Sequence, residues 1–266
     1  MRHKPLFVLP TFNERKRIDH ILKYYSTFGD VVVVDNFSSD GTVEVAAAHG
    51  AQILMKRNDG TVQTPEWNKW LRSKLGDVPI IGLSCSEFIP ERTIHEIQNQ
   101  LLDSLVAVVR VEAHTYTDGI LLPLWGNKKR YIERGLHLGR LDMDSIRIHK
   151  PFEPLKNTKF CTVTLPAQHY VEHLRLTQFA AELIKVTNYA RVEAAQFKQD
   201  GKLRPGTRCV KSMLREFFNL CKIKNIIFLK TTIPQIFLRI IMHIVIYYEQ
   251  VAQTSKVENL YAKKYD

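Results

Sequence analysis

The chain has 266 residues, of which 45% are hydrophobic and 10% aromatic, a composition typical of a globular protein rather than a disordered one. Its formal net charge of +11 favours anionic partners, such as nucleic acid, nucleotide phosphates or a membrane surface, but does not indicate a fold. The four cysteines lie far apart without a C-x-x-C pair, which argues against a zinc site and a disulfide framework. The apolar run near the start is too short for a signal peptide, so we expect no secretion.

The first 112 residues alternate β-rich runs with helical patterns, which is typical of a parallel sheet with crossover helices. Strands are predicted at residues 5–10, 30–35, 51–56, 78–84 and 105–112. Apolar faces predict two of the helices between them, one with Ile18, Ile21, Leu22 and Tyr25, the other with Ile94, Ile97, Leu101 and Leu105. The predicted fold class is therefore α/β, with a Rossmann-like, doubly wound, mainly parallel sheet covered on both faces. Ligands of such sheets bind beyond the carboxyl ends of the strands.

The second half of the chain is expected to be more irregular and then helical. Residues 113–168 mix glycine, proline and charge, and we expect loops there that complete the sheet and the site. Helical spacing of apolar residues predicts one long helix over about 170–198, and further helices over about 210–221 and 233–250. We therefore predict one domain over residues 1–168 and a helical C-terminal region over residues 169–266.

Basic residues concentrate in that C-terminal region. Between Lys202 and Arg239 there are nine basic residues and one acidic residue, Glu216. The apolar stretch 233–248 is interrupted by Arg239 and His243, so it does not have the pattern of a membrane-spanning helix. The amphipathic helices could lie on an anionic membrane surface, or they could pack on the first domain or on another copy of the chain.

Two motifs follow the first two predicted strands, "FVLPTFNER" and "VVVVDNFSSDGT". Together they closely resemble the nucleotide-sugar site of inverting family 2 glycosyltransferases, which have the GT-A fold. The resemblance implies a nucleotide-sugar donor, commonly a UDP-sugar, and a pocket lined by Pro10, Thr11, Asn13, Glu14 and Ser39. It also implies that Asp35 reads the base, because uracil offers an imide N–H to a carboxylate. For Ser38 and Asp40 we favour capping of the following helix over ligand contact.

The resemblance continues, less specifically, beyond residue 60. "KRNDGTVQTPEWNKWL" is similar to the subgroup that builds lipopolysaccharide cores and other surface glycans, in which an asparagine matching Asn68 starts a helix under the diphosphate. This likeness implies a glycan or lipid-linked acceptor. The separated cysteines and the basic C-terminal helices lead us to expect a cytoplasmic protein that associates peripherally with the inner face of the cell membrane.

The chain departs from the family at two places, and each departure removes negative charge. Ser84-Cys85-Ser86 stands where the family has Asp-X-Asp, and His149-Lys150 stands where the subgroup has His-Glu. Because hydroxyls are poor ligands for Mg²⁺ or Mn²⁺, we predict no metal site and weak or absent metal dependence. We place all three residues of the first segment in the donor site, and we expect Lys150 to neutralise the diphosphate. Three arginines could assist it: Arg147, Arg130 and Arg140.

The catalytic base should be a carboxylate close to these segments. Glu87 is the best placed by sequence, although an acidic residue after a strand is often only a helix-start charge. The alternatives are Glu153, Asp144 and His149.

The predicted function is therefore inverting sugar transfer from a nucleotide-sugar donor. A catalytically inactive homologue that binds nucleotide within a glycan assembly complex remains the alternative, because the Asp-X-Asp motif is missing. Nucleic-acid binding is not predicted, since no recognised module is present. A nucleotidyltransferase is disfavoured as well, because "PTFNERKRI" contains no glycine for a phosphate loop.

Overall fold

The structure is a computed structural model. It describes residues 4–58, 61–117, 120–121, 130–148, 150–175, 179–201, 210–212, 214, 233, 236–247 and 249. The chain divides into two compact units, Met1–Leu176 and Thr177–Asp266. In the described residues the first unit contains the sheet and the second is helical.

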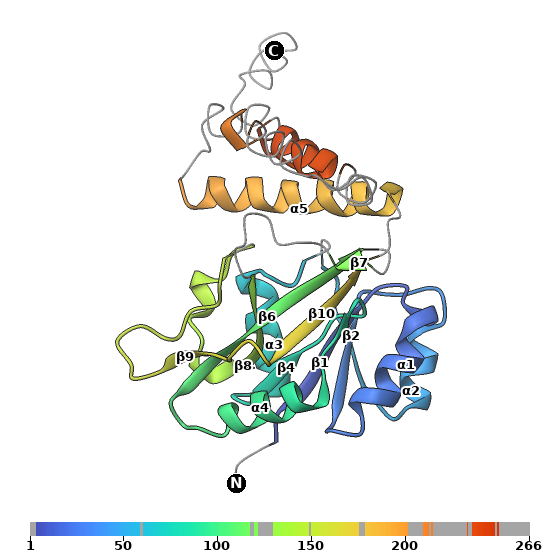
Figure 1. The fold of residues 1–266 in the computed structure, drawn as a ribbon, viewed down its shortest axis with the longest axis vertical. Coiled ribbons are helices and arrows are strands. Elements are labelled where there is room, and N and C mark those ends of the chain that lie inside the picture. Colours follow the sequence, from blue (N-terminus) through green and yellow to red (C-terminus); the bar gives the residue numbers. More distant parts are fainter. Residues whose placement is uncertain are drawn as a thin grey trace, which may run out of the picture. The chain divides into compact units, whose positions relative to one another are not determined.

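The first unit is built on a mixed, mainly parallel sheet (Figure 1). Its strands are β1 (Leu6–Thr11), β2 (Val31–Asp35), β3 (Gln52–Met55), β4 (Pro79–Gly82), β5 (Glu87–Phe88), β6 (Val106–Thr117), β7 (Ile120–Leu121), β8 (Tyr131–His137), β9 (Cys161–Thr164) and β10 (Tyr170–Arg175). The order is β3-β2-β1-β4-β8-β6-β10-β5, with β7 and β9 also pairing with β6. β8 is antiparallel to both its neighbours, and β5 is antiparallel to β10. All five predicted strands and the α/β fold class are confirmed.

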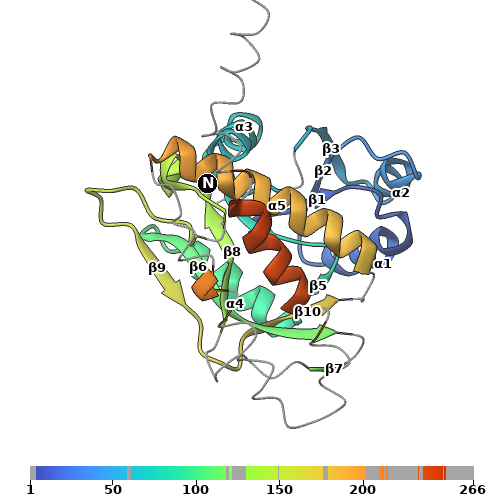
Figure 2. The same cartoon turned by 90° about the horizontal axis from the view of Figure 1, so that it is seen from above.

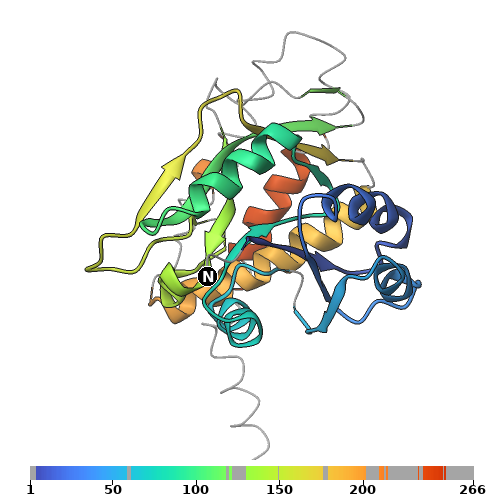
Figure 3. The same ribbon diagram turned by 90° about the horizontal axis from the view of Figure 1, so that it is seen from below.

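Helices cover both faces of this sheet, as predicted. They are α1 (Arg15–Tyr25), α2 (Thr42–Ala48), α3 (Pro65–Leu75) and α4 (Glu91–Leu101), together with the 3₁₀ turns η2 (Leu138–Arg140) and η3 (Met143–Ser145). Figures 2 and 3 show α3 on the opposite side of the sheet from α4.

Strand alternation explains the two layers. Phe7 and Leu9 face a core with α1 and α4, whereas Val8 faces a second core with α3 and the 3₁₀ turns. Successive side chains of a strand point to opposite faces, so one apolar strand contributes to both cores.

Sequence signals also explain where the elements begin. α3 begins after Thr64, whose hydroxyl accepts a hydrogen bond from the Trp67 amide, and Pro65 occupies the first helical position. The helix ends at Gly76, which has a φ of 84° that glycine adopts without strain.

The predicted helix over residues 170–198 is wrong at its start. Residues Tyr170–Arg175 form β10, which lies between β6 and β5, and the helix α5 covers only Phe179–Gln199. The apolar spacing of the short stretch "YVEHLR" fits both a helix and a strand. It forms a strand because it pairs with β6 along its whole length. The first compact unit consequently extends to Leu176, eight residues past the predicted boundary at 168.

In the second unit, the described residues include α5 and a helical segment over 236–247. The latter agrees with the helix predicted over 233–250. Most of the helix predicted over 210–221 lies outside the described residues.

Candidate functional site

The sheet has a topological switch point at β1. The chain moves from β1 to β2 on one side and on to β3, and then returns to place β4 on the other side of β1. Crossover helices on either side of such a point diverge and leave a crevice at the carboxyl ends of the strands. The segments that end there are those singled out in the sequence: Thr11 and its loop after β1, Asp35 and its loop after β2, and Ser84-Cys85-Ser86 after β4.

Asp35 is the centre of a hydrogen-bonded cluster at the ends of β1 and β2. Its side chain is fully buried (0% exposed), and both of its oxygens are engaged. Oδ2 accepts hydrogen bonds from Thr11 Oγ1 at 2.8 Å and Ser38 Oγ at 2.6 Å, and Oδ1 accepts one from the Ser38 amide at 2.6 Å. The carboxylate therefore holds the two strand ends together.

The loops after β1 and β2 are joined by hydrogen bonds between backbone amides and side chains. The Asn13 amide donates to Ser38 Oγ at 2.8 Å, and the Asn13 side-chain oxygen accepts from the Ser39 amide at 3.0 Å. Asn13 has a positive φ of 54°, a conformation that asparagine tolerates better than most residues. The Glu14 amide donates to Thr42 Oγ1 at 2.8 Å, so the first turns of α1 and α2 are tied to each other.

Asp40 bonds to the first residue of α2, as predicted for a capping side chain, but Gly41 is the N-cap residue, and Ser38 does not bond to the helix. The Asp40 carboxylate accepts hydrogen bonds from the amide and the hydroxyl of Thr42, the first residue of α2, and from the Arg15 amide. The Thr42 hydrogen bond is the main reason why the pKa of Asp40 lies below its ordinary value. Ser38 bonds to Asp35 instead of the helix.

Two exposed aromatic side chains flank this cluster, and the sequence interpretation missed both. Phe12 is 57% exposed and Phe37 is 49% exposed. Phe37 has a φ of 61°, which is unusual for a bulky side chain and costs on the order of 1–3 kcal/mol. The Arg57 guanidinium lies 4.9 Å from the centre of its ring. The signal in the sequence was an aromatic residue among polar ones directly after each strand, and such rings offer stacking surfaces for a nucleobase.

The segment after β4 carries a line of polar side chains. Ser84 Oγ lies 3.0 Å from Ser86 Oγ, which lies 3.4 Å from Nε2 of His173. His173 arrives from β10, directly opposite Glu87 in the antiparallel pair. Cys85 points into the core between the two serines, and burial raises the pKa of its thiol.

Glu87 is held in an ion pair and is not a free base. Both carboxylate oxygens lie 2.5 Å from Nη2 of Arg134, and the two side chains are only 5% and 19% exposed. Nδ1 of His173 lies 3.8 Å from Glu87 Oε1. β8 pairs Gly135 with Val109 and Glu133 with Arg110, so Arg134 is an extra residue at a β-bulge, a feature that redirects a side chain.

Arg134 and His173 were both missed from the sequence. Arg134 becomes recognisable only through the bulge, and His173 was assigned to a helix because the strand β10 was not predicted.

The donor set at this strand end does not fit a divalent cation. It consists of two hydroxyls, an imidazole and a neutral thiol, whereas Mg²⁺ and Mn²⁺ prefer carboxylate oxygens. The adjoining carboxylate, Glu87, is already neutralised by Arg134. Across the part of the chain that the structure describes, no group of three histidine, cysteine, aspartate or glutamate side chains is arranged to hold a metal ion.

Asn68 has a structural role at the start of α3. It is the fourth residue of α3, it is buried, and its amide group donates to the carbonyls of Val62 and Thr64 at 2.8 and 2.9 Å. It thereby fixes the loop that leads into the helix.

The structure does not bring Glu153 to the carboxyl ends of the strands. The Glu153 carbonyl accepts a hydrogen bond from the Asp142 amide. Arg140, two residues before Asp142, donates to the carbonyls of Asp103 and Val106 at the start of β6. The start of β6 is at the opposite edge of the sheet, because β6 runs in the same direction as β4. Arg140 is engaged there as well.

The remaining basic residues and alternatives are placed less centrally. Lys150 is exposed, and its amide donates to the Arg147 carbonyl in a turn. Arg147 donates to the carbonyls of Asp144 and Ile146, and Arg130 is exposed just before β8. His149 lies outside the described residues.

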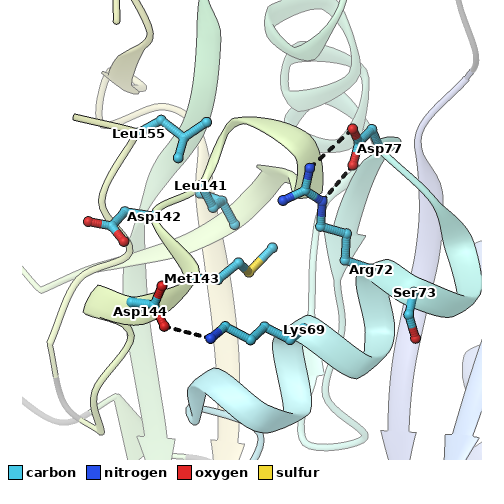
Figure 4. A pocket seen from close by; sticks show the side chains of 9 residues that line it. All are labelled: Lys69, Arg72, Ser73, Asp77, Leu141, Asp142, Met143, Asp144 and Leu155. Atoms are coloured by element: carbon cyan, nitrogen blue, oxygen red, sulfur yellow. Dashed lines mark hydrogen bonds and ion pairs between the residues drawn. The ribbon is translucent and has the colours of Figure 1, made fainter. Parts of the chain in front are cut away.

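A cavity of about 440 Å³ lies between α3 and the segment with η3 (Figure 4). It is lined by Lys69, Arg72, Ser73, Asp77, Leu141, Asp142, Met143, Asp144 and Leu155. Lys69 pairs with Asp144 at 2.5 Å and Arg72 pairs with Asp77 at 2.6 Å. The hydrogen bond from Lys69 holds the pKa of Asp144 below its ordinary value, which makes this exposed carboxylate a weak base. None of the residues after β1, β2 or β4 lines this cavity.

Comparisons with known proteins find likeness only among solved structures. No protein-family model matches the chain, and no curated protein does. Glucosyl-3-phosphoglycerate synthase from Mycobacterium tuberculosis, in complex with Mn²⁺, UDP and phosphoglyceric acid, matches with a TM-score of 0.46 and 16% identity, over 76% of this chain and 81% of that one. TarS from S. aureus matches with a TM-score of 0.45 and 16% identity, over 73% of this chain and 40% of that one. At this level of identity and superposition, these likenesses carry no argument about activity.

Proposed function

We propose that the chain is an inverting glycosyltransferase of the GT-A type that takes its sugar from a UDP-sugar. The observation that supports this most is the cluster of Thr11, Asp35 and Ser38, which joins the two sequence motifs beside the switch point of the sheet. In this proposal the uracil lies over the ends of β1 and β2. Turning of the Ser38 hydroxyl would free Asp35 for the imide N–H, and Phe12 or Phe37 would supply a stacking surface.

The other expected donor contacts belong to the same proposal. Pro10, Asn13, Glu14 and Ser39 would surround the nucleoside, and Asn68 would order the loop next to the diphosphate. The diphosphate would then extend from the β1 end towards Ser84-Cys85-Ser86 at the β4 end, since these strands are neighbours. Lys150 would supply positive charge there, which is the reason for proposing transfer without a metal.

The proposal is tested by titration calorimetry of UDP, GDP and CDP and their sugar conjugates, first in EDTA and then with Mn²⁺. We expect UDP to bind in EDTA and Lys150→Ala to weaken binding. The matched control is Lys156→Ala, because Lys156 is an exposed lysine six residues later that pairs with Asp142 away from the strand ends. UDP binding only with Mn²⁺ would contradict the role of Lys150, and absence of binding in both conditions would contradict the proposed donor.

A catalytically inactive, nucleotide-binding homologue is the second candidate. Two observations favour it: the serines that replace the family's aspartates, and the pairing of Glu87 with Arg134, which removes the expected base. The two candidates differ in turnover. Release of UDP from a bound UDP-sugar, with water or a glycan as acceptor, supports the transferase, whereas tight binding without release supports the homologue.

We further propose that the acceptor is a lipid-linked or surface glycan and that the basic C-terminal region binds an anionic membrane. The helical segment 236–247 has exposed apolar side chains, among them Phe237, Ile244 and Tyr247. In the described residues, no helix is long and apolar enough to cross a bilayer. Sedimentation with anionic vesicles, but not with neutral ones, and release by salt would support surface binding. Equal binding to neutral vesicles would contradict it.

A further inference from the structure

Five polar side chains from three segments of the sequence form a continuous line at the carboxyl end of β4. The line runs from Ser84 through Ser86 to His173 and on to Glu87 and Arg134, with separations of 3.0, 3.4, 3.8 and 2.5 Å. Its inner end is a buried ion pair, and its outer end consists of two half-buried hydroxyls. Within this line the imidazole of His173 is the group that can hold and give up a proton near neutral pH, and Ser86 lies between it and the outer end.

The position of the outer end determines which substrate group it would meet. Ser84 and Ser86 follow β4, the strand on the other side of the switch point from β2. In the proposed function, a nucleotide whose base lies over the ends of β1 and β2 extends its phosphates towards the end of β4. The leaving group of sugar transfer, a diphosphate, would therefore lie against the two hydroxyls, and it would need a proton or positive charge as it departs.

The surroundings of His173 place a carboxylate on the side of the ring that faces away from Ser86. Glu87 faces Nδ1, and on β6 the residue opposite His173 is the neutral Thr115. The other charged or titratable groups near Glu87 are Arg134 on β8 and Tyr25 on α1, whose pKa is raised by burial, whereas Glu14 and Arg17 act on the thiol of Cys85. The Arg134 charge is shared by both Glu87 oxygens, so it repels the imidazolium less than a free guanidinium would.

We propose that the Ser86 hydroxyl donates a proton to the departing diphosphate and that His173, held by Glu87, resupplies it. This inference rests on the proposed function. It assigns the neutralisation of the leaving diphosphate to Ser86 and His173. Ser86 is the residue that touches the phosphate, and His173 acts through it.

The step balances as follows. The bond between the anomeric carbon and the phosphate oxygen breaks, and its electron pair stays on that oxygen. The oxygen takes the proton of Ser86 Oγ, while Ser86 takes the proton of His173 Nε2. The acceptor oxygen bonds to the anomeric carbon and loses its proton to water, and the neutral imidazole recovers a proton from solvent.

The test measures UDP-glucose binding in EDTA by calorimetry and UDP release from UDP-glucose between pH 5.5 and 9.5. The proteins are the full-length wild type, His173→Gln, Ser86→Ala and the control His95→Gln, an exposed histidine on α4. For the wild type we expect log kcat to fall with a slope of about −1 above the pKa of the imidazole, because the proton donor is lost. His173→Gln should lower kcat about 100-fold at the low-pH plateau, remove this alkaline limb and leave the Kd for UDP-glucose little changed. Ser86→Ala should lower kcat comparably, and it removes only one oxygen from a half-buried site, which limits its effect on folding.

The outcomes separate this inference from the function on which it rests. If wild type and His173→Gln both bind UDP-glucose and turn it over with the same pH profile, the inference is overturned, but the proposed function is not. An acidic limb that disappears in His173→Gln also overturns the inference, since His173 would then accept a proton. Absence of binding of both UDP-glucose and UDP by the wild type contradicts the proposed function, and the inference with it.

Discussion

The ion pair between Arg134 and Glu87 gives the strongest test of the structure. In Arg134→Met, the Glu87 carboxylate keeps a side-chain exposure of about 5% but loses the guanidinium that contacts both of its oxygens. Breaking a buried pair in this way costs about 3–5 kcal/mol, since an uncompensated charge is left behind. With a urea m-value of about 2 kcal/mol/M, the unfolding midpoint should move down by about 1.5–2.5 M.

Tryptophan fluorescence during urea unfolding measures this effect in the correct part of the chain. All three tryptophans lie before residue 177, so their emission reports on the first unit. Arg72→Met is the matched control: it breaks the pair with Asp77, whose partners are 38% and 62% exposed, and exposed pairs contribute less than about 1 kcal/mol. The double variant Glu87→Met/Arg134→Met should recover most of the stability, because it leaves no buried charge unpaired.

The reasoning would be refuted if Arg134→Met cost no more than Arg72→Met. It would also be refuted if the double variant were as unstable as the sum of its two single variants, since that would mean that the charges do not interact.

Three further predictions concern the sheet. Gly135→Ala should destabilise the first unit by about 1–3 kcal/mol in urea unfolding, because the new Cβ would lie 2.7–2.9 Å from side chains of α4 and β6. Gly82→Ala should be tolerated, because the nearest atom to its Cβ is 4.0 Å away. Equal effects of the two substitutions would contradict the packing. Asp35→Asn should lower the free energy of unfolding by about 1–3 kcal/mol, since its amide N–H would face the donors that now point at a carboxylate oxygen. An unchanged urea midpoint would argue against the cluster. Burial lowers the pKa of His137 to about 4, so the unfolded chain binds the proton more tightly, and stability is lost as the pH falls from 6.5 towards 4. When the urea midpoint is measured over this pH range, His137→Gln should lose less stability than the wild type. An equal loss in the two proteins would contradict this assignment.

The parts of the fold that could be predicted from the sequence are those set by local patterns. Runs such as "VVVVD" are buried on both faces and can only be inner strands, and the helices between them show their apolar faces. The motifs after β1 and β2 were found for the same reason, because each is a short segment at a strand end.

The parts that could not be predicted depend on distant partners. The six residues of β10 form a strand only because β6 and β5 pair with them. The environment of Glu87 depends on Arg134, 47 residues later in the chain, and that of Ser86 on His173, 87 residues later. A local pattern identified Glu87 as an acidic residue at a strand end, but its pairing with Arg134 is a tertiary property.

The insertion of β10 between β6 and β5 determines when this region can become native during synthesis. The strand Glu87–Phe88 has β10 as its partner in the sheet, so it has no hydrogen-bonded neighbour until residue 175 has left the ribosome. At 5–20 residues per second, that interval lasts about 4–18 seconds. During this time the nascent chain exposes a strand edge and the lone carboxylate of Glu87, first without Arg134 and then without β10. We expect chaperone binding and aggregation of truncated chains to decrease abruptly once translation passes β10.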